Sequence, residues 1–159
     1  MRSRIGSPRP GRGLFALPLL ALLLCLAAAP AARAQSNIDL ATRWGLLGVW
    51  KTDCATPLAR STPELIYVVR DGVLYHDRNF GDAQDASPVQ LAVLRPDGTL
   101  ELTVQFAELK QTRQYAFRKL AEGRKQVVMN RNVNTDEYTV RDGKLVSNGN
   151  PMPVQYRCR

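Results

Sequence analysis

The chain has 159 residues, of which 22 are Lys or Arg and 14 are Asp or Glu, for a formal net charge of +8. Five of these arginines and none of the acids lie in the first 34 residues, so the remainder carries 17 basic residues against 14 acidic ones, a net charge of +3. This near balance excludes a strongly basic nucleic-acid-binding domain, and the length predicts a single domain.

Residues 1–34 have the pattern of a secretory signal peptide. Their arginine-rich start is followed by an apolar run from Leu14 to Ala29 and by Ala32-Arg33-Ala34, which fits an A-x-A cleavage site. We therefore predict that residues 1–34 are removed and that residues 35–159 form a single β-barrel domain in the periplasm or outside the cell. The apolar run is shorter than the ~20 residues of a membrane span, and an uncleaved anchor is the alternative.

A short helix is predicted at the start of the mature chain, with strands throughout the rest. Ser36 or Asn37 can cap a helix that runs through Asp39 and Arg43 and ends near Gly45. After Gly45, short β-rich runs alternate with turn dipeptides such as Asp-Gly, a pattern typical of hairpins. The predicted strands are 46–52, 65–70, 73–77, 89–95, 99–106, 111–120, 125–131, 137–141, 144–147 and 154–158.

This series predicts an all-β fold, an antiparallel up-and-down meander of roughly eight to ten strands. The run from Thr99 to Phe106 shows the pattern most clearly, because its apolar and polar residues alternate without a fault. A meander of this size forms a barrel or a sandwich or open sheet. We favour the barrel because closure removes exposed strand edges.

Two cysteines remain after signal removal, Cys54 and Cys158, and the oxidising compartment predicts one disulfide between them. This bond would tie the end of the first strand to the last strand. The third cysteine, Cys25, follows three leucines within the apolar run, whereas a lipoprotein cysteine follows small residues.

Three short motifs resemble those of the lipocalins and the wider calycin group of up-and-down barrels. Gly48-x-Trp50 follows a short helix, as the first signature of that family does. Thr135-Asp136-Glu137-Tyr138 resembles its T-D-Y turn with one extra residue, and Arg157 lies in the last strand, where the family has an arginine. The resemblance implies a calycin-like barrel whose bottom is closed by Trp50 beneath Arg157.

The residues themselves support a structural role for Trp50. A tryptophan on an apolar strand is by default a core aromatic, and a cation over its face adds a cation–π interaction. The predicted disulfide brings the strand of Arg157 near Trp50, while Arg141 and Arg159 are rival candidates for that cation.

The leading functional hypothesis is non-enzymatic binding of a small apolar or amphipathic ligand inside the barrel. Barrels of about eight strands can hold one small ligand, and the resemblance points to a group that commonly does so. The same side chains could instead fill the interior and leave no pocket. The candidate lining residues are Leu65, Tyr67, Leu100, Leu102, Val104, Phe106, Tyr115 and Phe117.

The alternative is an envelope-associated interaction module that binds through its surface. The segment 110–131 holds seven basic residues and one acid, Glu122, so a basic hairpin is predicted that could meet anionic lipid, lipopolysaccharide or an acidic protein. The alternative interpretation is that this segment is a solvated hairpin without a binding role. The candidate contact residues are Arg118, Lys119, Arg124 and Lys125.

No sequence pattern indicates catalysis, a metal site or a cofactor. The one histidine, His76, stands beside Asp77, Arg78, Asp82 and Asp85, but a zinc site usually needs three or four His, Cys or carboxylate ligands. We therefore predict a solvated strand end and a polar loop there, with a weak calcium site or a ligand-contacting rim as the alternative. Nucleophile motifs and phosphate-binding glycine loops are missing from the sequence as well.

Overall fold

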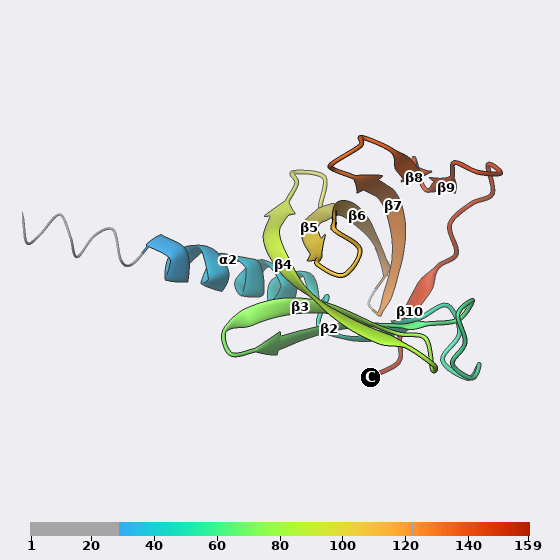
Figure 1. Cartoon of the computed structure of the whole chain (residues 1–159), viewed down its shortest axis with the longest axis horizontal. Helices are drawn as coiled ribbons and strands as arrows, with labels where there is room; N and C mark the ends of the chain where they lie inside the picture. Colours follow the sequence, from blue (N-terminus) through green and yellow to red (C-terminus); the bar gives the residue numbers. More distant parts are fainter. Residues whose placement is uncertain (1–28, 122) are drawn as a thin grey trace, which may run out of the picture. The chain divides into compact units, whose positions relative to one another are not determined.

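The computed structural model describes residues 29–121 and 123–159 (Figure 1). Most of the predicted signal peptide, including Cys25, lies outside the described residues. The predicted cleavage site after Ala34 falls within the first described element, helix α2, which spans Ala29–Trp44. Residues 33–159 form one compact unit.

Helix α2 ends where the sequence predicts, but Asn37 does not cap it. Gly45 has φ of 80°, and the Gly45 and Leu46 amides donate to the Thr42 and Ala41 carbonyls at 3.0 and 2.9 Å. This left-handed glycine and its two hydrogen bonds are a common way to terminate a helix. Ser36 and Asn37 both lie within the helix, so the prediction that one of them caps it is wrong.

The side chain of Asn37 instead binds strand β4 at an irregularity in its pairing. The register of β4 with β5 shifts between Val89 and Leu91, which leaves backbone groups without ladder partners. Asn37 Nδ2 donates to the Gln90 carbonyl at 3.2 Å, and its Oδ1 accepts from the Ala92 amide at 2.9 Å. The Asn37 side chain thus provides hydrogen-bond partners for two backbone groups at the bulge and holds α2 against the sheet.

Ten strands follow the helix, and each overlaps a predicted one. They are β1 Gly48–Lys51, β2 Glu64–Arg70, β3 Val73–Asn79, β4 Gln84–Leu94, β5 Leu100–Phe106, β6 Gln111–Ala121, β7 Arg124–Asn132, β8 Tyr138–Arg141, β9 Lys144–Leu145 and β10 Gln155–Arg157.

Eight of these strands close into an antiparallel barrel, which confirms the predicted fold class. Strands β1 to β7 form a meander, and β10 lies between β1 and β7 to complete the ring. The start of β7 pairs with β10, through Arg124 and Lys125, and its later part pairs with β8. The β8–β9 hairpin therefore lies outside the ring (Figure 1).

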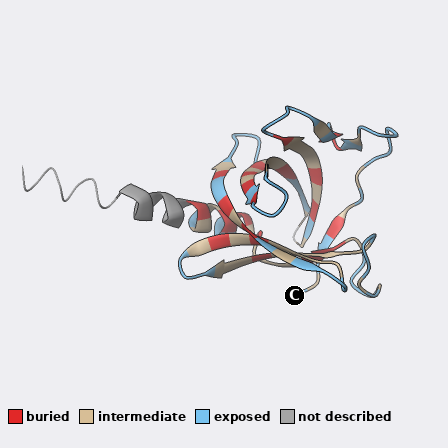
Figure 2. Cartoon of the chain, in the orientation of Figure 1, coloured by how far each residue is buried: buried red, intermediate tan, exposed pale blue. Residues whose placement is uncertain are grey.

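The core lies inside the barrel because apolar residues alternate along its strands. In β5, Leu100, Leu102, Val104 and Phe106 are all buried, and the residues between them are more exposed. Figure 2 shows the resulting bands of buried and exposed residues along the strands. The alternation predicted from the sequence is therefore the one that defines the inner face.

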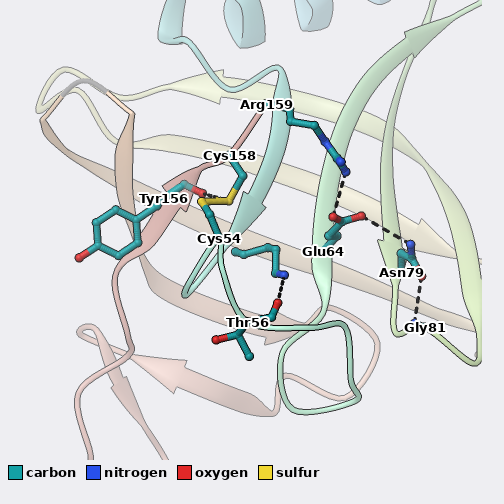
Figure 3. Close-up of polar contacts among 9 residues, drawn as sticks. Cys54, Thr56, Glu64, Asn79, Gly81, Tyr156, Cys158 and Arg159 are labelled. Atoms are coloured by element: carbon teal, nitrogen blue, oxygen red, sulfur yellow. Dashed lines mark hydrogen bonds and ion pairs between the residues drawn. A yellow bond between two sulfur atoms is a disulfide. The ribbon is translucent and has the colours of Figure 1, made fainter.

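A disulfide between Cys54 and Cys158 fastens the last strand to the first, as predicted (Figure 3). The adjoining backbone is tied as well: the Val49 amide donates to the Arg159 carbonyl at 2.9 Å, and the Cys158 amide donates to the Val49 carbonyl at 2.7 Å. Arg159 also pairs with Glu64 of β2 at 2.9 Å. The C-terminus is thus joined to two neighbouring strands.

Gly48 permits this close approach of the C-terminus. Its φ is 129°, and a Cβ atom at this position would lie 2.4 Å from the Arg159 carbonyl oxygen. Any side chain would displace backbone rather than a flexible side-chain end. The glycine of the Gly48-x-Trp50 motif therefore has a local steric reason to be a glycine.

Replacing Cys54 by Ser should lower the free energy of unfolding, because the bond closes a loop with a sequence separation of 104. The chain-entropy model sets an upper value of about 4–5 kcal/mol. Urea unfolding measures the loss, and alkylation followed by mass spectrometry should show Cys158 reactive in the variant alone. Reaction of Cys158 in the oxidised wild-type protein would contradict the assignment.

Candidate functional site

The eight predicted lining residues do come together in the barrel interior, where they pack against one another. Tyr115 and Phe117 are stacked with ring centres 6.0 Å apart, and Tyr67 meets Phe117 edge-on at 5.9 Å. All eight belong to the buried core or pack directly against it. The contacts that could hold a ligand are thus made between the protein's own side chains.

Lys125 also lies in this interior, so its prediction as a surface residue is wrong. It is fully buried, and its Nζ lies 4.4 Å from the ring centre of Phe117, 4.8 Å from Trp50 and 5.1 Å from Tyr67. It donates a hydrogen bond to Gln155 Oε1. Burial lowers the pKa of Lys125 well below its usual value.

The strand alternation explains the burial of Lys125. Lys125 and Val127 share the inner face of β7, while Arg124 is exposed. The sequence carried this signal, since Lys125 is two residues from an apolar strand position. Its charge places Lys125 with its basic neighbours, but successive side chains of a strand point to opposite faces, so Lys125 and Arg124 lie on different sides of the sheet.

Trp50 is buried, in agreement with the prediction, and its indole N–H donates to the Leu46 carbonyl at 2.7 Å. Arg157 is its register partner in β10 and is exposed. Lys125 provides the cation over the Trp50 ring, whereas the sequence had suggested only arginines for this role. Of the rivals, Arg141 lies over the ring of Tyr138, and Arg159 pairs with Glu64.

His76 is buried in mid-strand rather than solvated at a strand end, so that prediction is wrong. Strand β3 continues to Asn79 and pairs with β4 from Gln84, which makes most of the predicted loop a hairpin. The imidazole stacks on Tyr67 at 4.8 Å, and its Nδ1 has no hydrogen-bond partner among the described residues. Burial, together with the smaller effect of the charges of Lys125 and Arg78, lowers the pKa of His76 to about 3.

The acids near His76 pair with arginines instead of converging on a metal. Arg70 binds Asp77 at 2.7 Å, Arg60 binds Asp82 at 3.0 Å, and Arg78 binds Asp85. Among residues 29–121 and 123–159, no cluster of three or more His, Cys, Asp or Glu side chains is placed to hold a metal ion.

Two adjoining cavities lie at the end of the barrel where α2 terminates. The larger has a volume of about 620 Å³ and the smaller about 370 Å³. They share Arg43, Lys119 and Ala121 as lining residues. The larger is also lined by Trp44, Leu94, Asp97, Gly98, Arg118 and Leu120, and the smaller by Gly45, Trp50, Gly123, Arg124 and Arg157.

The apolar wall of the larger cavity is built on Trp44. This indole packs against Phe117 of the core at 6.5 Å and donates its N–H to the Gly98 carbonyl at 2.9 Å. Leu94 and Leu120 stand beside it with 45% of their surface exposed. The cavity therefore exposes apolar surface that the barrel core does not cover.

Five basic side chains surround the cavities: Arg43, Arg118, Lys119, Arg124 and Arg157. Within the described part of the chain, none of the five forms an ion pair with a carboxylate. Among the described residues that line the cavities, Asp97 is the one carboxylate, and hydrogen bonds from Thr99 lower its pKa, with a smaller contribution from Arg118. This end of the barrel is thus positively charged.

The structure brings together three of the four predicted surface residues here: Arg118, Lys119 and Arg124 are exposed and line the cavities. Sequence reasoning missed Arg43 and Trp44, which come from α2. Their proximity to the β6–β7 hairpin depends on how α2 packs against the barrel, and no local sequence pattern indicates this packing.

The sequence matches no protein-family model, no curated protein and no solved structure. The resemblance to lipocalins therefore stays a prediction. Within residues 29–121 and 123–159, the structure contains no helix of the length and hydropathy that a membrane span requires.

The depressed pKa of His76 predicts that stability falls as the pH drops below 6.5. The unfolded chain then takes up a proton that the native state does not bind until the pH approaches 3. Between pH 7 and pH 5 this costs about 2 kcal/mol. Urea unfolding should show a smaller loss over this range in His76→Phe, which keeps a stacked ring without the titration. Equal losses in both proteins would contradict the prediction.

Proposed function

We propose that this protein is an exported, non-catalytic binding protein that holds a small amphipathic molecule at the α2 end of its barrel. The observation that carries the proposal is the larger cavity, in which Trp44, Leu94 and Leu120 adjoin exposed cations. Its volume of about 620 Å³ lies within the range of small-molecule sites, ~300 to 1,000 Å³.

The end of the barrel is favoured over its interior because the interior side chains already satisfy one another. Tyr67, His76, Tyr115 and Phe117 form a continuous set of ring contacts. Neither described cavity is lined by any of the eight residues predicted to bind a ligand. Admitting a ligand there would require this packing to be broken.

Binding is favoured over catalysis because of which groups line the cavities. Where the structure describes the chain, the lining residues include no Ser, Cys or His that could serve as a nucleophile or a neutral base, and they include one carboxylate, Asp97. The predicted signal peptide and the resemblance of Gly48-x-Trp50 to the lipocalin signature also support an exported binding protein.

Removing the apolar wall should weaken binding of an amphipathic probe such as 1-anilinonaphthalene-8-sulfonate. We expect the Leu94→Ser, Leu120→Ser double variant to lose about tenfold or more in affinity, because both leucines contribute apolar area to the cavity. Fluorescence titration measures the affinity, and circular dichroism checks the fold.

Leu109→Ser is the matched control for this experiment, since Leu109 is as exposed but lies in the β5–β6 turn and lines neither cavity. It should bind the probe like the wild-type protein. The proposal fails if the wild-type protein does not bind the probe, or if the control loses as much affinity as the double variant.

A second candidate function is docking of the same end on an anionic membrane of the cell envelope. Exposed Leu94 and Leu120 beside Arg118 and Lys119 give this rim the mixed apolar and basic character of an interfacial surface. The predicted alternative of a basic hairpin thus keeps support, although Lys125 takes no part in it.

Charge reversal tests the membrane hypothesis. The Arg118→Glu, Arg124→Glu variant should lose co-sedimentation with vesicles of phosphatidylglycerol and phosphatidylcholine, because juxtamembrane cations are attracted to anionic lipid. Lys144→Glu, an exposed site in β9, is the control and should sediment like the wild-type protein. No wild-type binding to these vesicles, or equal loss in the control, would remove this candidate.

A further inference from the structure

Charge is distributed unequally between the two cavities. Eight of the described residues line the smaller one; four of these are basic, namely Arg43, Lys119, Arg124 and Arg157, and none of the eight is acidic. The carboxylate of Asp97 and the leucines line the larger cavity alone. The smaller cavity is therefore polar and basic, whereas the larger one is the apolar compartment.

These four cations come from α2, from the β6–β7 hairpin and from β10, which the folded barrel brings to one end. The stem of Arg157 lies over Gly48, with Cδ 3.2 Å from the position of a Cβ there, and its amide donates to the Gly123 carbonyl at 2.9 Å. Arg124 is the register partner of Tyr156 beside it. The barrel closure thus places Arg124 and Arg157 on adjacent strands.

Lys119 and Arg43 stand between the two compartments, since both line each cavity. Lys119 Nζ lies 5.2 Å from the Trp44 ring centre and 3.7 Å from the position that a Cβ on Gly45 would occupy. The Arg43 Nε donates to the Asp39 carbonyl at 3.3 Å. One molecule that spans both cavities would pass these two cations.

The C-terminal end of α2 does not cancel this positive charge. Its Ala41 and Thr42 carbonyls accept hydrogen bonds from Leu46 and Gly45, so they are satisfied within the helix cap. The five basic side chains around the two cavities also outnumber Asp97, the acid among the described lining residues, together with Asp39 and Glu122, which are close to lining residues in the sequence. An anion is therefore the group that this end of the barrel attracts.

We infer that the smaller cavity binds the phosphate-type headgroup of a single-chain amphiphile whose apolar chain lies in the larger cavity. This inference rests on the proposed function and names the ligand class of the same site. Three guanidinium groups favour a phosphate monoester over a carboxylate, because each can donate two parallel hydrogen bonds to phosphate oxygens. A doubly charged headgroup also matches several cations better than a single charge does.

Isothermal titration with four probes tests the assignment: dodecyl phosphate, dodecyl maltoside, inorganic phosphate and lauric acid, with each amphiphile below its micelle concentration. Dodecyl phosphate should bind at least about tenfold more tightly than the neutral maltoside and than lauric acid, since charge-assisted hydrogen bonds are lost with those probes. Inorganic phosphate should bind most weakly because it leaves the apolar cavity empty.

Variants of the smaller cavity should weaken binding of the anionic probes and leave binding of the neutral probe unchanged. Arg157→Gln and Arg124→Gln should each weaken dodecyl phosphate about tenfold and leave the maltoside unchanged, and Arg157→Lys should retain part of the affinity because it keeps the charge without the planar fork. Arg141→Gln, at an exposed arginine of β8 that lines neither cavity, should change nothing.

The outcomes separate this inference from the proposed function. Equal binding of dodecyl phosphate and dodecyl maltoside would overturn the headgroup assignment while leaving an amphiphile-binding protein. Inorganic phosphate binding as tightly as dodecyl phosphate would overturn the division into two compartments. Failure of every amphiphile to bind would overturn both proposals.

Discussion

Closure of the barrel by β10 is the constraint on which the other features depend. This strand has three residues, yet it completes the ring between β1 and β7. Its short hydrogen-bonded ladder is reinforced by the Cys54–Cys158 bond and by the contact of Arg159 with Glu64. Gly48 allows the C-terminal backbone to come close enough for these bonds to form. Without β10, Lys125 would lose its hydrogen-bond partner Gln155.

The closed barrel buries two titratable side chains, Lys125 and His76, within its apolar core. Lys125 is surrounded by three aromatic rings, which offer an ammonium group the negative faces of their π systems. His76 is held neutral by burial and by nearby positive charge. Both groups make the interior sensitive to protonation, and both occupy volume in which a ligand would otherwise sit. The packed interior therefore favours the surface of the barrel as the place for the proposed binding site.

Ion pairing differs between the arginines near strands β2 to β4 and those at the α2 end of the barrel. Arg60, Arg70 and Arg78 are paired with the acids Asp82, Asp77 and Asp85. The cations at the α2 end have no such partners in the described part of the chain, and they stand beside exposed leucines. Unbalanced charge next to uncovered apolar surface is costly for a monomer unless something binds there. This contrast is the physical basis of the proposed site.

The sequence by itself determined the antiparallel meander, the position of each strand, the pairing of the two cysteines outside the predicted signal peptide and the inward face of β5, because alternation, turn dipeptides and cysteine count are local or compositional signals. It did not determine that the β8–β9 hairpin lies outside the ring that β10 closes. The alternation of side chains along β7, which buries Lys125, was also present in the sequence, although the basic residues around Lys125 suggested an exposed position. Only the tertiary structure decided that His76 lies in mid-strand, that Asn37 binds a bulge in β4, and that Arg43 and Trp44 join the β6–β7 hairpin at one site. These features depend on contacts between residues far apart in the chain, where helix docking and barrel closure set the distances.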